Sequence, residues 1–274
     1  MSVVTLSSDI GFQDYIIAAF KGQIISQNSQ ALLVDINHEL NATNYPHAAF
    51  ICSQAYSYFP KGTIHVLLID CFEGNNEQFL LIKHNDQFII CPDNGIATML
   101  VPSPKFVYSI PLSTHFSILH ITQQLALVIH QLLCNVLPED FLKNATNFQQ
   151  KIALQPLVGS NWIEGQILMI DKFDNVIVNI TRQQFEEAAA GRPFEISVPH
   201  SSGINKISNH YSEVPKGEVL AMFNAANYLE LAVNNGKMAA LFGLRSFSTR
   251  NVSTGSVTSN TLFYQTIRIY FLNK

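Results

Sequence analysis

The first half of the chain alternates between short apolar runs and segments with helical spacing. The apolar runs are of strand length and rich in branched residues, which is typical of strands buried inside a parallel sheet. Because helical segments separate consecutive runs, right-handed crossovers are expected. The predicted strands are residues 3–8, 31–36 and 64–70, and the predicted helices are residues 14–28 and 46–59.

The next segments extend this N-terminal domain. Residues 79–83 and 87–91 read as a hairpin that turns at Asn85 and Asp86. A turn at 92–95, a strand at 105–110 and a long apolar helix at 118–133 follow. We therefore predict an α/β N-terminal domain with a mainly parallel sheet.

The pattern changes after a polar stretch that ends at Pro156, so we place the domains at residues 1–155 and 156–274. A helix begins after Thr181, with Gln184 completing a capping box, and ends at Gly191. The remaining runs predict a smaller C-terminal β-barrel domain. Its expected strands are residues 163–170, 176–180, 194–198, 219–223, 229–233 and 262–271.

Composition narrows the possible partners. Apolar residues make up 47% of the 274 residues, charged residues make up 13%, and the formal net charge is −4. This balance offers no basic surface for nucleic acid or anionic lipid. The low charge also favours a surface that another copy of the chain covers.

No feature of the sequence predicts a membrane protein or a secreted protein. The first apolar run is interrupted at Asp9, and no apolar stretch approaches the roughly 18 residues of a membrane helix. The four cysteines are scattered, without the paired spacing of a metal site. We expect a cytoplasmic protein with reduced thiols.

Aspartates stand at or near the predicted strand ends of the first half: Asp9, Asp35, Asp70 and Asp93. Parallel strands bring their carboxyl ends to one edge of a sheet, where α/β proteins bind ligands. A single aspartate at such a position usually caps a turn. The group as a whole predicts a binding crevice, and Asp70 is the first candidate in it.

The residue types at this edge suggest the kind of ligand. Carboxylates without basic neighbours suit a divalent metal or an organic cation, and a carboxylate also binds the two hydroxyls of ribose. Only His38 lies near enough to add a metal ligand, so we expect no metal and no cofactor. No glycine-rich phosphate loop is present. Cys71 is either a nucleophile or, more simply, a buried inert thiol.

The second half contains one unusual turn, Asp171-Lys172-Phe173-Asp174-Asn175, between two predicted strands. An aromatic side chain flanked by amide and carboxylate groups is suited to binding a planar ligand ring by stacking and hydrogen bonds. The plainer alternative is a polar hairpin turn.

Taken together, these segments resemble the S-adenosyl-L-methionine (SAM) hydroxide adenosyltransferases, or SAM hydrolases, which are related to the fluorinase and chlorinase. The similarity runs nearly from end to end. The matching segments are Thr5–Gly11 with Asp14-Tyr15, Val34–His38, Tyr58–Val66, Pro92–Gly95, Asp171–Asn175 with Asn179-Ile180, Val214–Glu218, Asn224, and Tyr228–Gly236.

The resemblance implies a function and a set of roles. It implies a homotrimer with each ligand between one subunit's N-terminal domain and a neighbour's C-terminal domain, and SAM as substrate rather than cofactor. The reaction is attack of water at ribose C5′, giving adenosine and L-methionine. By position, Asp9 holds the ribose, Asp14 and Asp171 the methionine end, and Phe173 and Asn175 the adenine. Asp70 belongs to the family's Asp-Arg-His set for the attacking water, and His115 is the candidate histidine.

The chain departs from the family pattern around Asp70. The family turn D-P-G-V-G is replaced by Asp70-Cys71-Phe72-Glu73-Gly74, the family arginine aligns with Glu77, and the serine expected after Asn224 is Ala225. A glutamate would oppose a second anion beside Asp70. Three hypotheses follow: a SAM hydrolase, a non-catalytic or altered binder of SAM or adenosine, and a metal-dependent hydrolase.

Overall fold

The structure, a computed structural model, describes residues 3–72, 78–112, 117–199, 203–254 and 257–272, with the side chains of 247–263 excepted. The chain divides into two compact units, Met1–Ala153 and Leu154–Lys274. Within the described ranges, no helix is both long enough and apolar enough to span a membrane.

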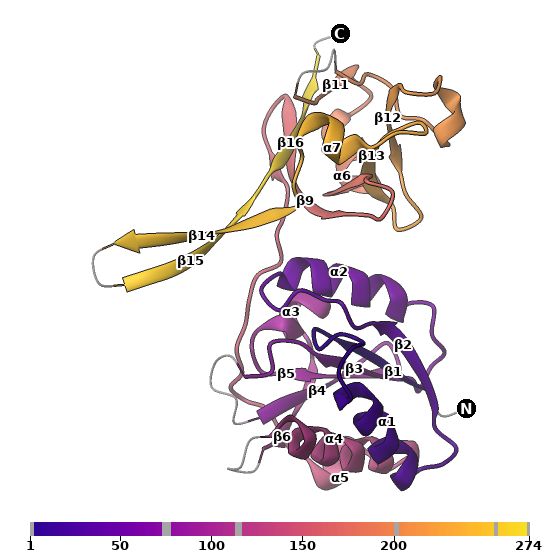
Figure 1. Ribbon diagram of the computed structural model, residues 1–274, viewed down its shortest axis with the longest axis vertical. Coiled ribbons are helices and arrows are strands. Elements are labelled where there is room, and N and C mark those ends of the chain that lie inside the picture. Colours follow the sequence, from indigo (N-terminus) through magenta and orange to yellow (C-terminus); the bar gives the residue numbers. More distant parts are fainter. Residues whose placement is uncertain (1–2, 73–77, 113–116, 200–202, 255–256, 273–274) are drawn as a thin grey trace. The chain divides into compact units, whose positions relative to one another are not determined.

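The N-terminal unit is a seven-stranded sheet in the order β2-β1-β3-β5-β4-β6-β7 (Figure 1). Strands β2, β1, β3 and β5 pair in parallel, and β4, β6 and β7 extend the sheet through antiparallel pairs. This confirms the predicted α/β domain. The strands are β1 (Val3–Ser8), β2 (Leu32–Asn37), β3 (Ile64–Leu68), β4 (Gln78–His84), β5 (Gln87–Pro92), β6 (Phe106–Pro111) and β7 (Lys143–Asn144).

Helices cover both faces of this sheet. Ile64, Val66 and Leu68 of β3 pack into one core with α1 and α4, whereas Leu67 and Ile69 pack into a second core with α2 and α3. Burial of both faces explains why this strand is a continuous apolar run rather than an alternating one. The helices are α1 (Ile16–Gln27), α2 (Tyr45–Tyr56), α3 (Ile96–Leu100), α4 (Ile118–Leu133) and α5 (Pro138–Phe141).

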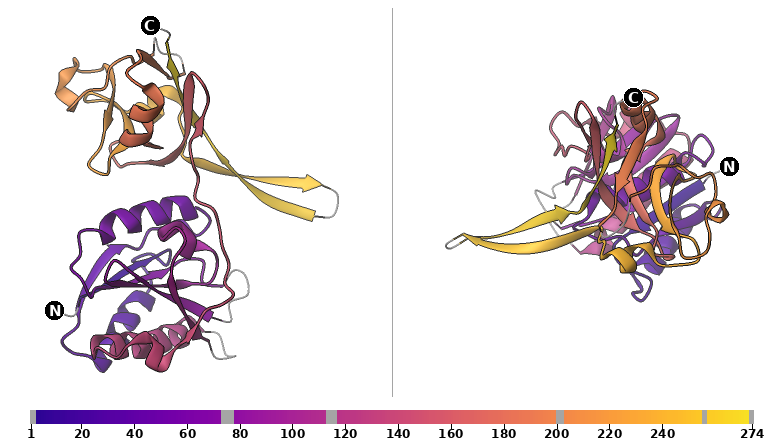
Figure 2. Two further views of the ribbon diagram at one scale, coloured as in Figure 1. Left: turned by 180° about the vertical axis from the view of Figure 1, so that it is seen from behind. Right: turned by 90° about the horizontal axis from the view of Figure 1, so that it is seen from above.

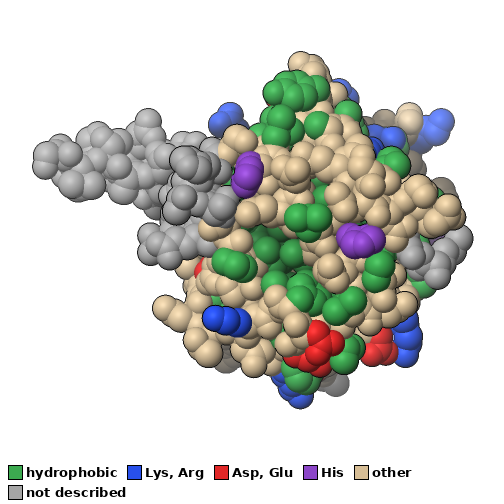
Figure 3. Space-filling model, turned by 90° about the horizontal axis from the view of Figure 1, so that it is seen from below, with side chains coloured by type: hydrophobic (Ala, Val, Ile, Leu, Met, Phe, Trp, Pro, Cys, Tyr) green, Lys and Arg blue, Asp and Glu red, His purple; other side chains and the backbone are tan. Residues whose placement is uncertain are grey.

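Helix α4 contains no Asp, Glu, Lys or Arg, and its Leu127 is 50% exposed. Figure 3 shows the molecule from below relative to Figure 1. Hydrophobic side chains lie near the centre of the surface in this view, and most charged groups lie toward its rim. The outer face of the N-terminal unit is therefore poor in charge at this point.

The C-terminal unit is a curled antiparallel half-barrel sheet in the order β11-β16-β9-β10-β13-β12, with β8 paired to β9. Its core gathers Ile163, Ile167, Val178, Leu231 and Ile269. The strands are β8 (Leu157–Val158), β9 (Trp162–Ile170), β10 (Val176–Thr181), β11 (Phe194–Ser197), β12 (Val219–Phe223), β13 (Tyr228–Val233) and β16 (Thr266–Phe271). Its helical elements are α6 (Arg182–Ala189), η1 (Tyr211–Glu213) and α7 (Met238–Phe242).

The predicted helix after Thr181 is confirmed as α6, complete with the capping box between Thr181 and Gln184. The single strand predicted at 262–271 is wrong. The segment splits at Gln265, whose backbone carbonyl accepts from the Ile167 N–H at 2.9 Å. The first part is β15 (Val257–Tyr264), which pairs with β14 (Phe247–Thr254) in a separate ribbon that Figure 2 shows in two views.

Candidate functional site

The parallel strands of the N-terminal unit bring the predicted aspartates to one edge of the sheet. Asp9 follows β1, Asp70 follows β3, Asp93 follows β5, and Asp35 lies within β2, two residues before its end. Since β2, β1, β3 and β5 are consecutive in the sheet, their carboxyl ends form a continuous row. This is the edge at which open α/β sheets bind ligands.

Asp70 lies in the middle of this row and is held by three neighbours. Its N–H donates to Asp9 Oδ2 at 2.7 Å, and Tyr45 Oη donates to its Oδ2 at 2.5 Å. The Asn94 amide donates to the carbonyls of Ile69 at 3.0 Å and Asp70 at 3.4 Å. Asp70 has a φ of 49°, a left-handed conformation that is uncommon outside glycine and is often found at functional sites.

The surroundings of Asp9 shift its pKa. Burial raises the pKa of Asp9, backbone hydrogen bonds from Asp70 and from Asp9 itself lower it, and the charge of Asp70 raises it again, with a net upward shift. Burial, followed by the charges of Asp9 and Asp70, also raises the pKa of the Cys71 thiol. Cys71 therefore stays protonated, which favours the inert thiol over the nucleophile.

The expectation that these carboxylates lack basic neighbours is wrong for Asp35. Lys21 Nζ lies 2.5 Å from Asp35 Oδ2, and His38 Nε2 lies 3.0 Å from Oδ1. Burial raises the pKa of Asp35, but the hydrogen bonds and charges of Lys21 and His38 outweigh burial and lower it. His38 Nδ1 lies 2.7 Å from Ser8 Oγ, and both residues are fully buried. This Ser–His–Asp series therefore braces β1 against β2.

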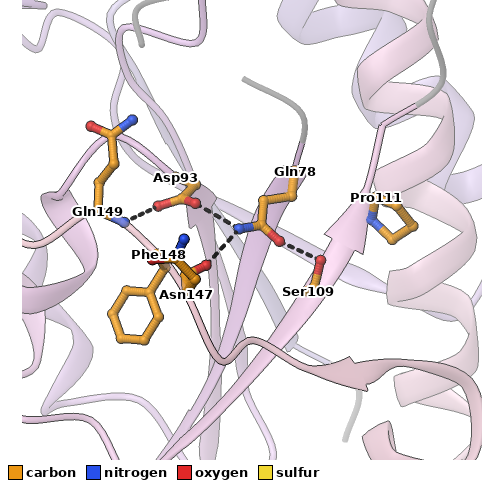
Figure 4. Close-up of a pocket in the computed structure, with 7 residues that line it drawn as sticks. All are labelled: Gln78, Asp93, Ser109, Pro111, Asn147, Phe148 and Gln149. Atoms are coloured by element: carbon orange, nitrogen blue, oxygen red, sulfur yellow. Dashed lines mark hydrogen bonds between the residues drawn. The ribbon is translucent and has the colours of Figure 1, made fainter. Parts of the chain in front are cut away.

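Asp93 lines a polar hollow of about 620 Å³ beside β4 and β6, and Figure 4 shows it with the other lining residues. Its two oxygens accept from the Gln149 N–H and from Gln78 Nε2, each at 2.7 Å. Ser109 Oγ donates to Gln78 Oε1, which extends the network across β6. Asp93 is thus held by neutral donors.

Three other residues that the sequence singled out add less to the site. Asp14 is exposed ahead of α1, and its Oδ1 accepts from the Ile16 N–H at 3.2 Å. His115 and Glu77 lie outside the described residues.

The second group of predicted residues forms a tight turn between β9 and β10. Asp171 Oδ1 accepts from the N–H groups of Phe173 at 2.8 Å and Asn175 at 2.9 Å, and Oδ2 accepts from Asn175 Nδ2 at 3.1 Å. Asp174 is left-handed, with φ 72°. Both oxygens of Asp171 therefore shape the turn, and Phe173 is left 65% exposed.

Phe173 and Asn175 line a hollow of about 560 Å³ in the C-terminal unit. Tyr211, which the sequence did not single out, also lines it and donates to Glu230 Oε1 at 2.5 Å. Burial raises the pKa of Glu230, the Tyr211 bond lowers it and the charge of Asp171 raises it, with a net rise. The other lining residues are Lys172, Val233, Asn235, Gly236 and Lys237.

The row of carboxylates was predictable from strand order, but the contact from Tyr45 was not, because Tyr45 begins helix α2 and does not lie at a strand end. Asn94 was visible within the 92–95 turn, yet its contact with Asp70 depends on β5 lying beside β3. Among the described residues, no three His, Cys, Asp or Glu side chains are grouped to hold a metal ion.

These features define a class: an α/β unit with carboxylates at the sheet's carboxyl edge, followed by an antiparallel β unit with an aromatic-and-amide turn. The family profile of the SAM hydroxide adenosyltransferase N-terminal domain matches residues 4–141, and that of the C-terminal domain matches residues 165–250. The chain belongs to the SAM hydroxide adenosyltransferase family.

Individual relatives agree with this assignment. The chain is 24% identical over 247 residues to the (R)-S-adenosyl-L-methionine hydrolase of Methanocaldococcus jannaschii, covering 85% of this chain and 88% of that protein. It is 24% identical over 262 residues to the hydrolase of the same name from Thermus thermophilus, covering 89% and 97%. An uncharacterized conserved protein from Thermotoga maritima shares the fold, with a TM-score of 0.80 and 20% identity over 97% of this chain and 99% of that one.

Proposed function

We propose that this protein hydrolyses S-adenosyl-L-methionine to adenosine and L-methionine. The observation that carries the proposal is the Asp70 carboxylate at the carboxyl end of β3, beside Asp9 and with Oδ2 held by Tyr45. Relatives that carry the hydrolase name match most of the chain, which supports the same substrate class.

The chemistry requires only a positioned water and a base. The water oxygen forms a bond to C5′ while the C5′–S bond breaks, and the electron pair of that bond neutralises the sulfonium. Asp70 takes the proton that the water loses, as a general base. Asp9 accepts from the ribose hydroxyls, and the anionic edge favours the cationic sulfonium.

The turn at Asp171 supplies the other contacts. Phe173, which is largely exposed, stacks on the adenine, and Asn175 donates to its edge or accepts from it. Asp14 and Asp171 are assigned to the methionine end. No metal or cofactor takes part, and SAM is the substrate.

Turnover and binding are measured separately. The protein is incubated with SAM, chromatography measures released adenosine, and calorimetry measures SAM binding. We expect adenosine and methionine in equal amounts. Tight binding without adenosine would support the alternative of a SAM or adenosine binder, which Glu77 at the family arginine position favours. A requirement for Mg²⁺ or Mn²⁺ would support the metal-dependent hydrolase instead.

We also propose that the protein assembles as a homotrimer. Helix α4, which contains no Asp, Glu, Lys or Arg and exposes Leu127, is suited to contact with another copy. Light scattering coupled to size-exclusion chromatography should give three times the chain mass of 30.6 kDa. A mass equal to one chain would contradict the trimer and, with it, a ligand site shared between two subunits.

A further inference from the structure

Tyr45 contacts the carboxylate that we assign to the attacking water. It is the first residue of α2, it is 5% exposed, and its hydroxyl donates to Asp70 Oδ2 at 2.5 Å. No described residue donates to the other oxygen, Oδ1. Among the described residues, Tyr45 therefore holds one oxygen of Asp70, and none of them occupies the other, which can accept from a ligand or water.

The main chain of Asp70 is held independently of Tyr45. Its N–H donates to Asp9 Oδ2 and its carbonyl accepts from Asn94 Nδ2. These contacts maintain the left-handed turn but leave the rotation of the carboxylate unset. The hydroxyl of Tyr45 sets that rotation.

Tyr45 is itself held in place from two sides. The Asn44 side chain caps α2 by accepting from the His47 N–H at 3.2 Å, which fixes the start of the helix. The Lys151 ammonium lies 3.8 Å from the centroid of the Tyr45 ring. Lys151 is anchored by its own backbone, because its N–H donates to Thr98 Oγ1 at 2.9 Å and its carbonyl accepts from the same hydroxyl at 2.7 Å.

We propose that Tyr45 is a positioning residue for the hydrolysis, and this inference rests on the proposed function. By donating to Oδ2, Tyr45 holds the Asp70 carboxylate in the orientation that aims Oδ1 at the attacking water. A neutral phenol does this without adding a charge beside Asp70. A misoriented base is costly to the rate, because proton transfer requires hydrogen-bond geometry.

The test compares Tyr45→Phe with the wild type. Phenylalanine keeps the ring under Lys151 and removes only the hydroxyl. A hydrogen bond to a charged group contributes about 1.5–3 kcal/mol, so we expect kcat to fall roughly 10- to 100-fold. KM and the calorimetric Kd for SAM should stay within about twofold, since Tyr45 acts through Asp70 and not on the substrate.

A double-mutant cycle then tests whether Tyr45 acts through Asp70. Adding Tyr45→Phe to Asp70→Asn should lower kcat no further than Asp70→Asn alone. The matched control is Tyr58→Phe, since Tyr58 is 83% exposed, and melting curves verify that each variant is folded. The inference is overturned if kcat of Tyr45→Phe is unchanged, if KM rises alone, or if the two losses are additive. A wild-type protein that releases no adenosine overturns the proposed function as well.

Discussion

Asp9 and Asp70 are linked across the ends of neighbouring strands, because Asp9 Oδ2 accepts the Asp70 N–H at 2.7 Å. Burial is the main reason that the pKa of Asp9 is raised. Through this hydrogen bond Asp9 holds the main chain of Asp70, beside the carboxylate that we propose as the base.

Replacing Asp70 by asparagine should remove the base while keeping the shape of the turn. We expect kcat to fall by about 100-fold or more, with SAM binding largely retained. Adenosine release under saturating SAM measures the effect. Asp86→Asn is the matched control, because Asp86 is exposed in the β4–β5 hairpin and its carboxylate forms an ion pair with Lys61. Full activity in Asp70→Asn would show that another group handles the water.

Phe173→Ala should weaken binding rather than catalysis at saturation. Stacking of a base on an aromatic ring contributes roughly 1–3 kcal/mol, so the Kd for adenosine should rise about 5- to 150-fold. Since Phe173 is 65% exposed, the fold should be unaffected. Calorimetry with adenosine measures the change, and Phe106→Ala, at a position 57% exposed on β6, is the control. Equal losses in both variants would argue against stacking at Phe173.

Gly95→Ala should destabilise the N-terminal unit. Gly95 has a φ of +93°, and a Cβ there would lie 2.6 Å from Lys151 Cγ. We expect a loss of about 1–3 kcal/mol in the free energy of unfolding. Adding Lys151→Ala should recover the part due to the clash and leave the part due to φ. Urea unfolding, monitored by far-ultraviolet circular dichroism, measures the free energy of unfolding of the single and the double variant. Complete recovery of this free energy in the double variant would mean that the φ of Gly95 causes no strain when alanine replaces glycine.

His65 should make the N-terminal unit less stable in acid. It is buried, and its ring is stacked on the ring of Tyr56 with 3.8 Å between the ring centroids. Burial lowers the pKa of His65 to about 4. An unfolded histidine has a pKa near 6.5, so the unfolded state binds the proton first as the pH falls. Stability should therefore be complete above about pH 6.5 and decline by roughly 2–3 kcal/mol on the way to pH 4.

The control for this prediction is a histidine that is exposed. In His65→Gln the slope of unfolding free energy against pH should flatten between pH 6.5 and 4, whatever its absolute stability. His84→Gln, in the exposed β4–β5 hairpin, should keep the wild-type slope. Identical slopes in all three proteins would show that His65 is not the group that titrates.

Much of the fold was predictable because local patterns agree with it. The branched run at 64–70 indicated a strand covered on both faces, and the capping box of Thr181 and Gln184 marked the start of α6. The prediction failed at 262–271, where one polar residue, Gln265, separates strands of two sheets. Periodicity carries no information about which partner a strand will find.

For the site, strand order alone placed Asp9, Asp70 and Asp93 on one edge, since parallel strands end together. The sequence therefore determined which carboxylates share that edge. Only the tertiary structure decided which hydrogen-bond and ion-pair partners each carboxylate has. It engages Asp35 with Lys21, encloses Asp93 among neutral donors, and brings Tyr45 to Asp70 from a helix 25 residues away in the chain. Whether a hydrogen bond forms depends on a few tenths of an ångström in the distance between segments that are far apart in the sequence. Tertiary packing sets that distance.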